Sequence, residues 1–369
     1  MRMFCCSNCF ADAEIKAIID GNKATGNCDF CEKHNVYVYE IGKEPTIAEL
    51  FDGLLDIYTP ISDLPANFPR EQTDLIRNIL CSNWHIFNLK PDETYRLITA
   101  ICADRYREQP ELFDSPVGIK QGQDQDYLEE NSILKNNCWG DFVEGIKRKN
   151  RFHGNYINMD RLFVFLRCAV KARHKGEVLY RARVCPDEKG YRCVEMGPPP
   201  DTKAKGGRVN PTGISILYLS DSEETTLYEI RAGVYDFVTV GRFELLRDIE
   251  VINLAKIDRI SPFIGINYGF DFTQYAINIE HLKMIAREIA KPLRNDNVLD
   301  YLPTQYISDY IRSKGYDGIE YISTMSKNGT NLAVFDPSLF KCTDTRVYDI
   351  QSISYSYIPL TCFENCRVK

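Results

Sequence analysis

Hydrophobic residues in the first half of the chain recur with the spacing of helices. In TIAELFDGLLDIY, residues 46–58, apolar side chains return every three or four positions, as on one face of an amphipathic helix. The same spacing, with Pro91 suited to a first helical turn, predicts helices at residues 73–84, 91–106, 139–149 and 159–172. The polar stretch at 118–132 is predicted to be an exposed connection. Residues 45 to about 170 are therefore expected to be helical.

The pattern changes near residue 176, where short apolar runs replace the helical spacing. Runs rich in β-branched and aromatic residues predict strands at residues 177–184, 214–221, 236–243, 249–254, 317–323 and 330–336. Helices are predicted at 279–293 and 302–315, and Gly315 is well placed to end the second one. Strands with only a few interposed helices indicate an α+β domain rather than a doubly wound sheet.

A long loop rich in proline and glycine, residues 195–213, lies between two predicted strands. Loops of this length inside a compact domain are usually functional. The stretch GGRVNPTGISILYLSDSEETTLYEIR begins near the end of this loop. In it, Arg208 follows two glycines, and Glu229 comes later, after a predicted strand and the start of a predicted helix. One cation and one carboxylate in such a segment fit either an active site or an ion-paired hairpin.

Composition and charge narrow the class of protein. The chain has 369 residues, of which 44% are hydrophobic and 26% charged, and this suits a soluble protein of two or three domains. The net charge of −7 weighs against broad binding to nucleic acid or membrane surfaces. Apolar runs stay well short of the roughly 20 residues of a membrane helix, and the start resembles no signal peptide. A cytoplasmic location is predicted.

Fourteen cysteines are many for a cytoplasmic protein, where thiols stay reduced, so clustered cysteines suggest a metal. Cys6 and Cys9 form one CxxC pair, and Cys28 and Cys31 form another. Two such pairs supply the four ligands of a closed tetrahedral Zn²⁺ site, which would be structural because no position is left for water. Cys5 or His34 are alternative ligands at one position, and scattered buried thiols remain the competing interpretation.

One motif in the helical half suggests a different chemistry. Arg148 and His153, in RKNRFH, have the RxxxxH spacing of helical ribonucleases of the HEPN class. A histidine can exchange a proton with a ribose hydroxyl while an arginine steadies the phosphate. The spacing is common by chance, however, and the flanking basic residues equally fit a solvated helix end.

Several separated stretches in the second half resemble the RES domain. These are YRAR at 180–183, residues 206–231 as quoted above, YLPTQYISDYI at 301–311 and GYDGIEYISTMSKNGTNLAVF at 315–335. The resemblance covers residues 175 to about 345, and the preceding half is similar to the HEPN/RES N-terminal region found fused to such domains. It implies a fold like that of the ADP-ribosyltransferases and NAD as substrate. Members act as toxins of toxin–antitoxin pairs by degrading NAD, often with phosphate as acceptor, or ADP-ribosylate a protein.

The resemblance also implies site residues. Arg181 matches the family's early arginine, Arg208 the glycine-flanked arginine, Glu229 the glutamate and Ser323 the late serine, while Tyr218 takes the position of an aromatic residue near the nicotinamide. Glu229, Arg208 and Ser323 are thus the expected catalytic residues. Arg181, Arg208, Tyr218 and Gly207 are expected to bind NAD, with Gly207 letting the backbone approach it. Val209 departs from the pattern, since a tryptophan commonly follows the arginine.

The chemistry of NAD agrees with these residue types. An arginine fork binds pyrophosphate oxygens, and a carboxylate can stabilise the oxocarbenium-like ribose left when nicotinamide departs. Arg183 is an alternative to Arg181, because the two alternate on one strand. Glu229 and Arg208 could also form an ordinary ion pair.

The sequence therefore predicts an α+β protein in four segments: a zinc knuckle (1–42), a helical HEPN/RES N-terminal domain (43–172), an ADP-ribosyltransferase-like RES catalytic domain (173–350) and a C-terminal tail (351–369). The predicted function is an NAD glycohydrolase or phosphorylase of toxin or antiphage-defence type, with a cognate antitoxin and a homo-oligomeric state expected. Alternatives are a protein-modifying ADP-ribosyltransferase, a ribonuclease using Arg148 and His153 with the RES half as NAD sensor, and an NAD sensor without turnover.

Overall fold

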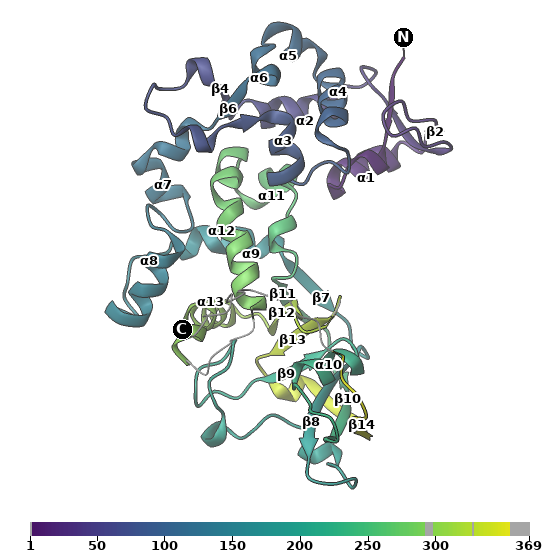
Figure 1. The fold of residues 1–369 in the computed structure, drawn as a ribbon, viewed down its shortest axis with the longest axis vertical. Helices are drawn as coiled ribbons and strands as arrows, with labels where there is room; N and C mark the ends of the chain where they lie inside the picture. Colours follow the sequence, from purple (N-terminus) through teal and green to yellow (C-terminus); the bar gives the residue numbers. More distant parts are fainter. Residues whose placement is uncertain (1, 292–297, 327, 355–369) are drawn as a thin grey trace, which may run out of the picture. The chain divides into compact units, whose positions relative to one another are not determined.

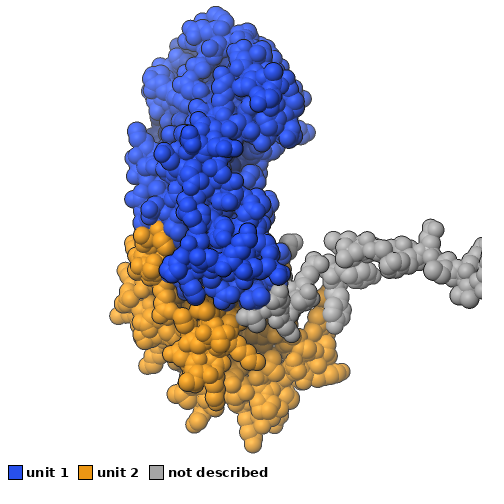
Figure 2. Space-filling view, turned by 90° about the vertical axis from the view of Figure 1, so that its left-hand side faces the viewer, with its two compact units in different colours: residues 1–171, 252–309 blue, residues 172–251, 310–369 orange. Residues whose placement is uncertain are grey.

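The computed structural model describes residues 2–291, 298–326 and 328–354. Their contacts divide the chain into two compact units, residues 1–171 with 252–309 and residues 172–251 with 310–369 (Figure 2). Residues 252–309 thus interrupt the second unit in sequence but belong to the first. Most of the predicted tail, from residue 355 on, lies outside the described residues. The division into four segments stays a prediction.

The first unit begins with a small sheet around the cysteine pairs. Three antiparallel strands in the order β1-β3-β2 have the bounds Phe4–Cys6 (β1), Val36–Glu40 (β3) and Thr25–Gly26 (β2). Helix α1 (Ala13–Gly21) lies between β1 and β2 in sequence, and it begins at Asp12, whose carboxylate accepts the backbone N–H groups of Glu14 and Ile15. Such a cap satisfies donors that the first helical turn leaves unpaired.

Helices make up most of the rest of the first unit (Figure 1). They are α2 (Thr46–Leu55), α3 (Ile76–Asn78), α4 (Pro91–Ile101), α5 (Ala103–Glu108), α6 (Glu111–Asp114), α7 (Gln125–Asn131), α8 (Trp139–Glu144), α9 (Met159–Cys168), α11 (Gly265–Tyr268) and α12 (Phe272–Ala290). A helix lies within each range predicted from apolar spacing, and π-helical turns continue α3 and α8. Part of the core is a group of aromatic rings, in which Phe87 lies 5.1 Å from Phe10 and 5.6 Å from Phe51 between ring centroids.

The prediction for residues 45 to 170 needs three corrections: short strands occur in it, the predicted connection holds a helix, and the last helix ends early. Strands β4 (Thr59–Pro60), β6 (Pro116–Gly118) and β5 (Asp74–Leu75) form a small sheet in the order β4-β6-β5, too short to give an alternating pattern. The predicted exposed connection contains α7, because the Asp124 side chain caps its N-terminus. The predicted helix at 159–172 stops at Cys168, and β7 (Val170–Arg173) follows.

An eight-stranded sheet, whose strands lie mostly in the second unit, has the order β14-β10-β8-β9-β13-β12-β11-β7. The strands not yet given are β8 (Val178–Cys185), β9 (Leu217–Ser220), β10 (Phe237–Leu245), β11 (Ile249–Asn253), β12 (Gly318–Ile322), β13 (Thr330–Val334) and β14 (Phe340–Asp349). Helix α10 (Glu223–Glu229) follows β9, and α13 (Leu302–Ser313) precedes β12. The six predicted strands are confirmed, and so is the α+β class. Gly315, at φ 88°, donates its N–H to Arg312 and ends the α13 region as expected.

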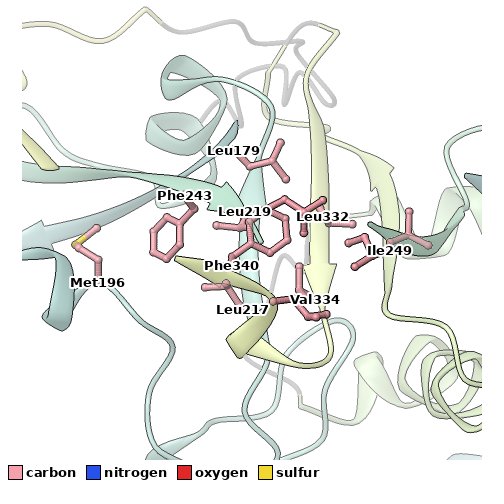
Figure 3. Close-up of a cluster of buried hydrophobic side chains, with 12 residues drawn as sticks. Leu179, Met196, Leu217, Leu219, Phe243, Ile249, Leu332, Val334 and Phe340 are labelled. Carbon is pink, nitrogen blue, oxygen red and sulfur yellow. The ribbon is translucent and has the colours of Figure 1, made fainter. Parts of the chain in front are cut away.

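Two groups of apolar side chains anchor the sheet. The larger group joins strands β8, β9, β10 and β13 with β14 (Figure 3), and its labelled members include Leu179, Leu219, Phe243, Leu332 and Phe340. The second group consists of Ala182, Val238 and Val240. It packs against Leu227 of α10 and against Ile230, which directly follows α10. Burial of one such large side chain contributes about 1.5–3 kcal/mol relative to exposure. Packing therefore fixes both α10 and the strands beside it, which carry the residues described next.

Among the described residues, no helix has both the length and the apolar character that crossing a membrane requires.

Candidate active site

Glu229 is the centre of a hydrogen-bond cluster that includes two of the predicted catalytic residues. It is the last residue of α10, where the helix dipole disfavours a negative charge, so the carboxylate needs compensating donors. Its Oε1 atom accepts the hydroxyl of Ser323 at 2.6 Å and the Nδ2 of Asn331 at 2.7 Å. The structure thus brings Glu229 and Ser323 into direct contact across 94 residues of sequence.

The hydroxyl of Ser323 has a fixed direction. Ser323 follows β12 and is buried, and its oxygen accepts the backbone N–H of Met325 at 3.2 Å and of Ser326 at 3.1 Å. With two N–H groups on the oxygen, the hydroxyl hydrogen is left for the carboxylate. A local turn therefore aims this serine at Glu229.

The register of three strands places a polar row beside Glu229. Ser220 on β9 lies opposite Asn331 on β13, and Asn331 lies opposite Tyr321 on β12. Directly opposite residues share one face of an antiparallel sheet, so these three side chains are neighbours. All three are buried, and the hydroxyl of Ser220 donates to Oδ1 of Asn331 at 2.6 Å.

Sequence reasoning missed Ser220 and Asn331. One signal was present: Asn331 interrupts an apolar strand, and a buried amide must find hydrogen-bond partners. The identity of those partners depends on strand register, which the sequence did not supply.

Arg208 lies next to this cluster. Its guanidinium is placed over the ring of Tyr321, 5.1 Å from the centroid, in a cation–π contact. Because Tyr321 is the strand neighbour of Asn331, this contact puts a positive charge near the residues that hold Glu229. Val209, which follows it, is buried, so its side chain offers no exposed stacking surface.

Arg181, Tyr218 and Gly207 form a second group. Arg181 and Tyr218 line a cavity of about 300 Å³ together with Pro199, Lys203, Ala204, Lys205, Asn210, Ser215 and Ile216. The Tyr218 hydroxyl donates to Asn210 Oδ1 at 2.7 Å and accepts the Val209 N–H at 3.2 Å. A Cβ on Gly207 would come within 2.7 Å of Asn210 Oδ1 and 3.0 Å of the Tyr218 oxygen. A side chain at this position would have to displace the Asn210 amide or the Tyr218 hydroxyl.

The second group is suited to an anion. Three basic residues line the cavity and no acidic residue does. Arg181 donates to the backbone carbonyl of Tyr218 at 3.2 Å, while its buried Nε has no hydrogen-bond partner among the described residues. Burial, aided by the nearby charge of Arg183, lowers the pKa of Arg181. A buried cation with an unused donor favours a negatively charged ligand.

Arg183 does not share these surroundings. It is exposed, donates to the Glu195 carbonyl at 2.9 Å and stacks over the Tyr191 ring at 4.2 Å. Of the two alternating arginines, Arg181 is the one that lines the cavity.

The four predicted metal ligands lie together in the first unit. The Sγ atoms of Cys6, Cys9, Cys28 and Cys31 are all within 4.8 Å of one another, and three of the separations are 3.8, 3.4 and 3.5 Å. A tetrahedral ion with metal–sulfur bonds of about 2.3 Å requires sulfur separations of about 3.8 Å. The four thiols therefore fit one metal ion. Neither Cys5 nor His34 belongs to the group found among the described residues.

The alternative ribonuclease pair has ordinary surface surroundings. Arg148 is 75% exposed and pairs with Glu144 at 2.9 Å, one helical turn away. His153 is exposed, and its backbone N–H donates to Asn150. These contacts favour the solvated helix end over a catalytic pair.

Two larger cavities, of about 770 and 700 Å³, lie in the first unit, and none of the predicted NAD-binding residues lines either of them. We therefore choose the Glu229 cluster and the basic cavity as the candidate site because of the residues they contain, although the other two cavities are larger.

Comparison with known proteins identifies the second half of the chain. No curated protein matches the sequence. A similar solved chain comes from the toxin–antitoxin complex MbcT–MbcA of M. tuberculosis; it is 14% identical, covers 52% of this chain and 94% of that chain, and has a TM-score of 0.31. The family model described as the RES domain matches residues 178–357. This match covers Arg181, Arg208, Glu229 and Ser323, so residues 178–357 are the part of the chain that matches the RES domain.

Proposed function

We propose that the RES domain cleaves the bond between nicotinamide and ribose in NAD, and that the protein is an NAD-degrading enzyme of toxin or antiphage-defence type. The RES resemblance implies NAD as substrate. The observation that carries the proposal is the hydrogen bond between Glu229 and Ser323, two of the residues expected from the family pattern. A fold of the ADP-ribosyltransferase kind is part of the same proposal.

The basic cavity would hold the charged part of NAD. Its pyrophosphate carries the negative charge that the unused donor of Arg181 and the two lysines, Lys203 and Lys205, favour. Tyr218 lines the cavity with these cations, and Gly207, which does not line it, lies next to the Tyr218 hydroxyl. Arg208 supplies a further positive charge near Glu229. Binding energy at the pyrophosphate would hold the ribose in a fixed position for cleavage.

Glu229 would act at the reacting ribose. The bonding electrons leave with nicotinamide, whose ring nitrogen loses its positive charge, so the departure needs no general acid. Positive charge then develops on the ribose, and the fixed carboxylate of Glu229 stabilises it more strongly in the transition state than in the bound substrate. Water would complete a glycohydrolase reaction, phosphate a phosphorylase reaction, and a protein side chain an ADP-ribosyltransferase reaction.

Zn²⁺ is the metal we propose for the four cysteines. Four thiolate ligands form a closed site, so the ion would support the fold of residues 1–42 and take no part in catalysis. The first unit, including the region similar to HEPN/RES N-terminal domains, would serve in regulation, recognition or assembly into a homo-oligomer. Because loss of NAD harms any cell, we further propose that an antitoxin partner restrains the enzyme.

Replacement of Arg181 by alanine is expected to lower NAD affinity about ten- to a hundredfold. Hydrogen bonds to charged groups contribute about 1.5–3 kcal/mol each, and about 1.4 kcal/mol corresponds to a factor of ten. Isothermal titration with NAD measures the effect. Arg183→Ala is the matched control, because it removes an exposed arginine two residues away on the same strand. Equal affinity of Arg181→Ala and Arg183→Ala for NAD would place the pyrophosphate elsewhere.

A further inference from the structure

We propose that Ser220 and Asn331 are positioning residues that hold the Glu229 carboxylate by its Oε1 oxygen and leave Oε2 for the ribose. This inference rests on the proposed function, because it assigns a role within the same reaction. Neither residue was among the expected site residues, and both act on the substrate only through Glu229.

A continuous chain of short hydrogen bonds joins the three residues. The Ser220 hydroxyl is 2.6 Å from Asn331 Oδ1, and Asn331 Nδ2 is 2.7 Å from Glu229 Oε1. Ser220 and Asn331 are each 4% exposed and lie opposite each other on β9 and β13. Their positions are set by the strand ladder, so the chain connects the rigid sheet to the end of α10.

The chemistry of the groups fixes the direction of every bond in this chain. An ionised carboxylate only accepts hydrogen bonds, so Asn331 must present its NH₂ group to Glu229. The carboxamide oxygen then faces Ser220 and only accepts, so the serine hydroxyl must donate to it. Ser220 thereby selects one of the two orientations of the amide. With the amide turned over, its oxygen would face the carboxylate and repel it.

The two oxygens of Glu229 are not equivalent. Oε1 receives both described donors, Ser323 and Asn331, whereas Oε2 has no hydrogen-bond partner within residues 2–291, 298–326 and 328–354. Glu229 is half-buried, while the donors behind it are buried. Two donors converging on one oxygen fix the rotation of the carboxylate. The remaining oxygen is free to accept a ribose hydroxyl and to face the developing positive charge.

If these hydrogen bonds position Glu229, loss of the Ser220 hydroxyl should lower kcat, which a purely structural role of Ser220 would not predict. Loss of the Ser220 hydroxyl leaves Glu229, Ser323 and Asn331 in place but frees the amide to turn over. Misplacement of a reacting group by about 1 Å can cost about a hundredfold in rate. The effect should therefore fall on kcat, since no contact between Ser220 and NAD is lost.

The test compares Ser220→Ala with Ser220→Thr in the full-length protein. For Ser220→Ala we expect kcat for nicotinamide release to fall about 10- to 100-fold, with KM for NAD and the melting temperature close to wild type. Ser220→Thr keeps a hydroxyl at the same position and should recover most of the rate. Asn331→Asp, which replaces the donor with a second carboxylate, should lose at least as much as Ser220→Ala. Ser338→Ala, at an exposed serine, is the control.

The outcomes separate this inference from the proposed function. If wild type releases nicotinamide, Glu229→Gln does not and Ser220→Ala turns over normally, the function stands and the positioning role is wrong. It is also wrong if Ser220→Ala loses activity only in proportion to a loss of folded protein, or if threonine restores none of the rate. If wild-type protein releases no nicotinamide, or if Glu229→Gln is as active as wild type, the proposed site fails and this inference fails with it.

Discussion

Replacement of Glu229 by glutamine is expected to lower kcat for nicotinamide release about 10²- to 10³-fold while NAD affinity stays near wild type. Glutamine has the size of glutamate and keeps an oxygen that can accept the hydrogen bonds of Ser323 and Asn331. It removes the negative charge that faces the ribose as this becomes cationic, and it puts an NH₂ group in the place of Oε2. Loss of one preorganised electrostatic contact in an active site typically costs about 10²- to 10³-fold in kcat.

Two measurements on purified protein give this comparison. Chromatographic detection of nicotinamide yields kcat, and calorimetric titration yields the affinity for NAD. Glu224→Gln is the matched control, since Glu224 is an exposed acid on the same helix. Normal turnover by Glu229→Gln would show that Glu229 is only a structural hydrogen-bond acceptor, because its charge would then make no difference to the reaction.

Loss of the four-cysteine site should unfold the first forty residues or so. The sheet there has three strands of two to five residues, which is too little buried surface to be stable alone. Zn²⁺ binding to cysteine sites of this kind contributes about 10–16 kcal/mol in small zinc-finger peptides, and that free energy is folding free energy. Wild type is expected to carry about one zinc ion per chain, and the double variant Cys9→Ser with Cys28→Ser is expected to carry none.

Elemental analysis and hydrogen exchange test this expectation together. Cys138→Ser, at an exposed cysteine outside the cluster, should keep the metal and the protection of strands β1 and β3. Nicotinamide release should persist in the double variant if its RES domain stays folded, because the cysteines belong to the other compact unit. A metal-free protein whose first strands exchange as slowly as before would rule out a structural metal.

Regular elements could be predicted wherever the sequence has a periodic pattern. The helix beginning at Thr46 buries an apolar face, and the strand at 330–334 is a short run that is buried at nearly every residue. Both patterns are visible in the sequence. Strand β14 was missed because its exposed positions are mostly polar, as in FKCTDTRVYD, and it pairs along β10 through backbone bonds. Hydrogen bonds between backbone groups do not depend on the side chains, so the pattern of hydrophobic residues does not reveal them.

The site residues were predictable in part, and for a different reason. Glu229, Arg208, Ser323 and Arg181 were predicted from the resemblance to the RES domain, which no periodicity would have supplied. Ser220 and Asn331 could not be connected with Glu229 because they lie 111 residues apart and meet only through the register of β9 and β13. The choice between Arg181 and Arg183 likewise required the structure, since the two differ in burial and not in spacing.

Cleavage of NAD by the RES domain can be tested in a single incubation. Full-length protein is mixed with NAD, with and without phosphate, in the presence and absence of a protein extract, and the products are identified by mass spectrometry. We expect stoichiometric loss of NAD with release of nicotinamide, and Glu229→Gln should remove that release. Free ADP-ribose would identify a glycohydrolase, its phosphate ester a phosphorylase, and protein-bound ADP-ribose a transferase. If NAD is recovered intact from wild-type protein under all of these conditions, the protein does not cleave NAD and the proposed function is wrong.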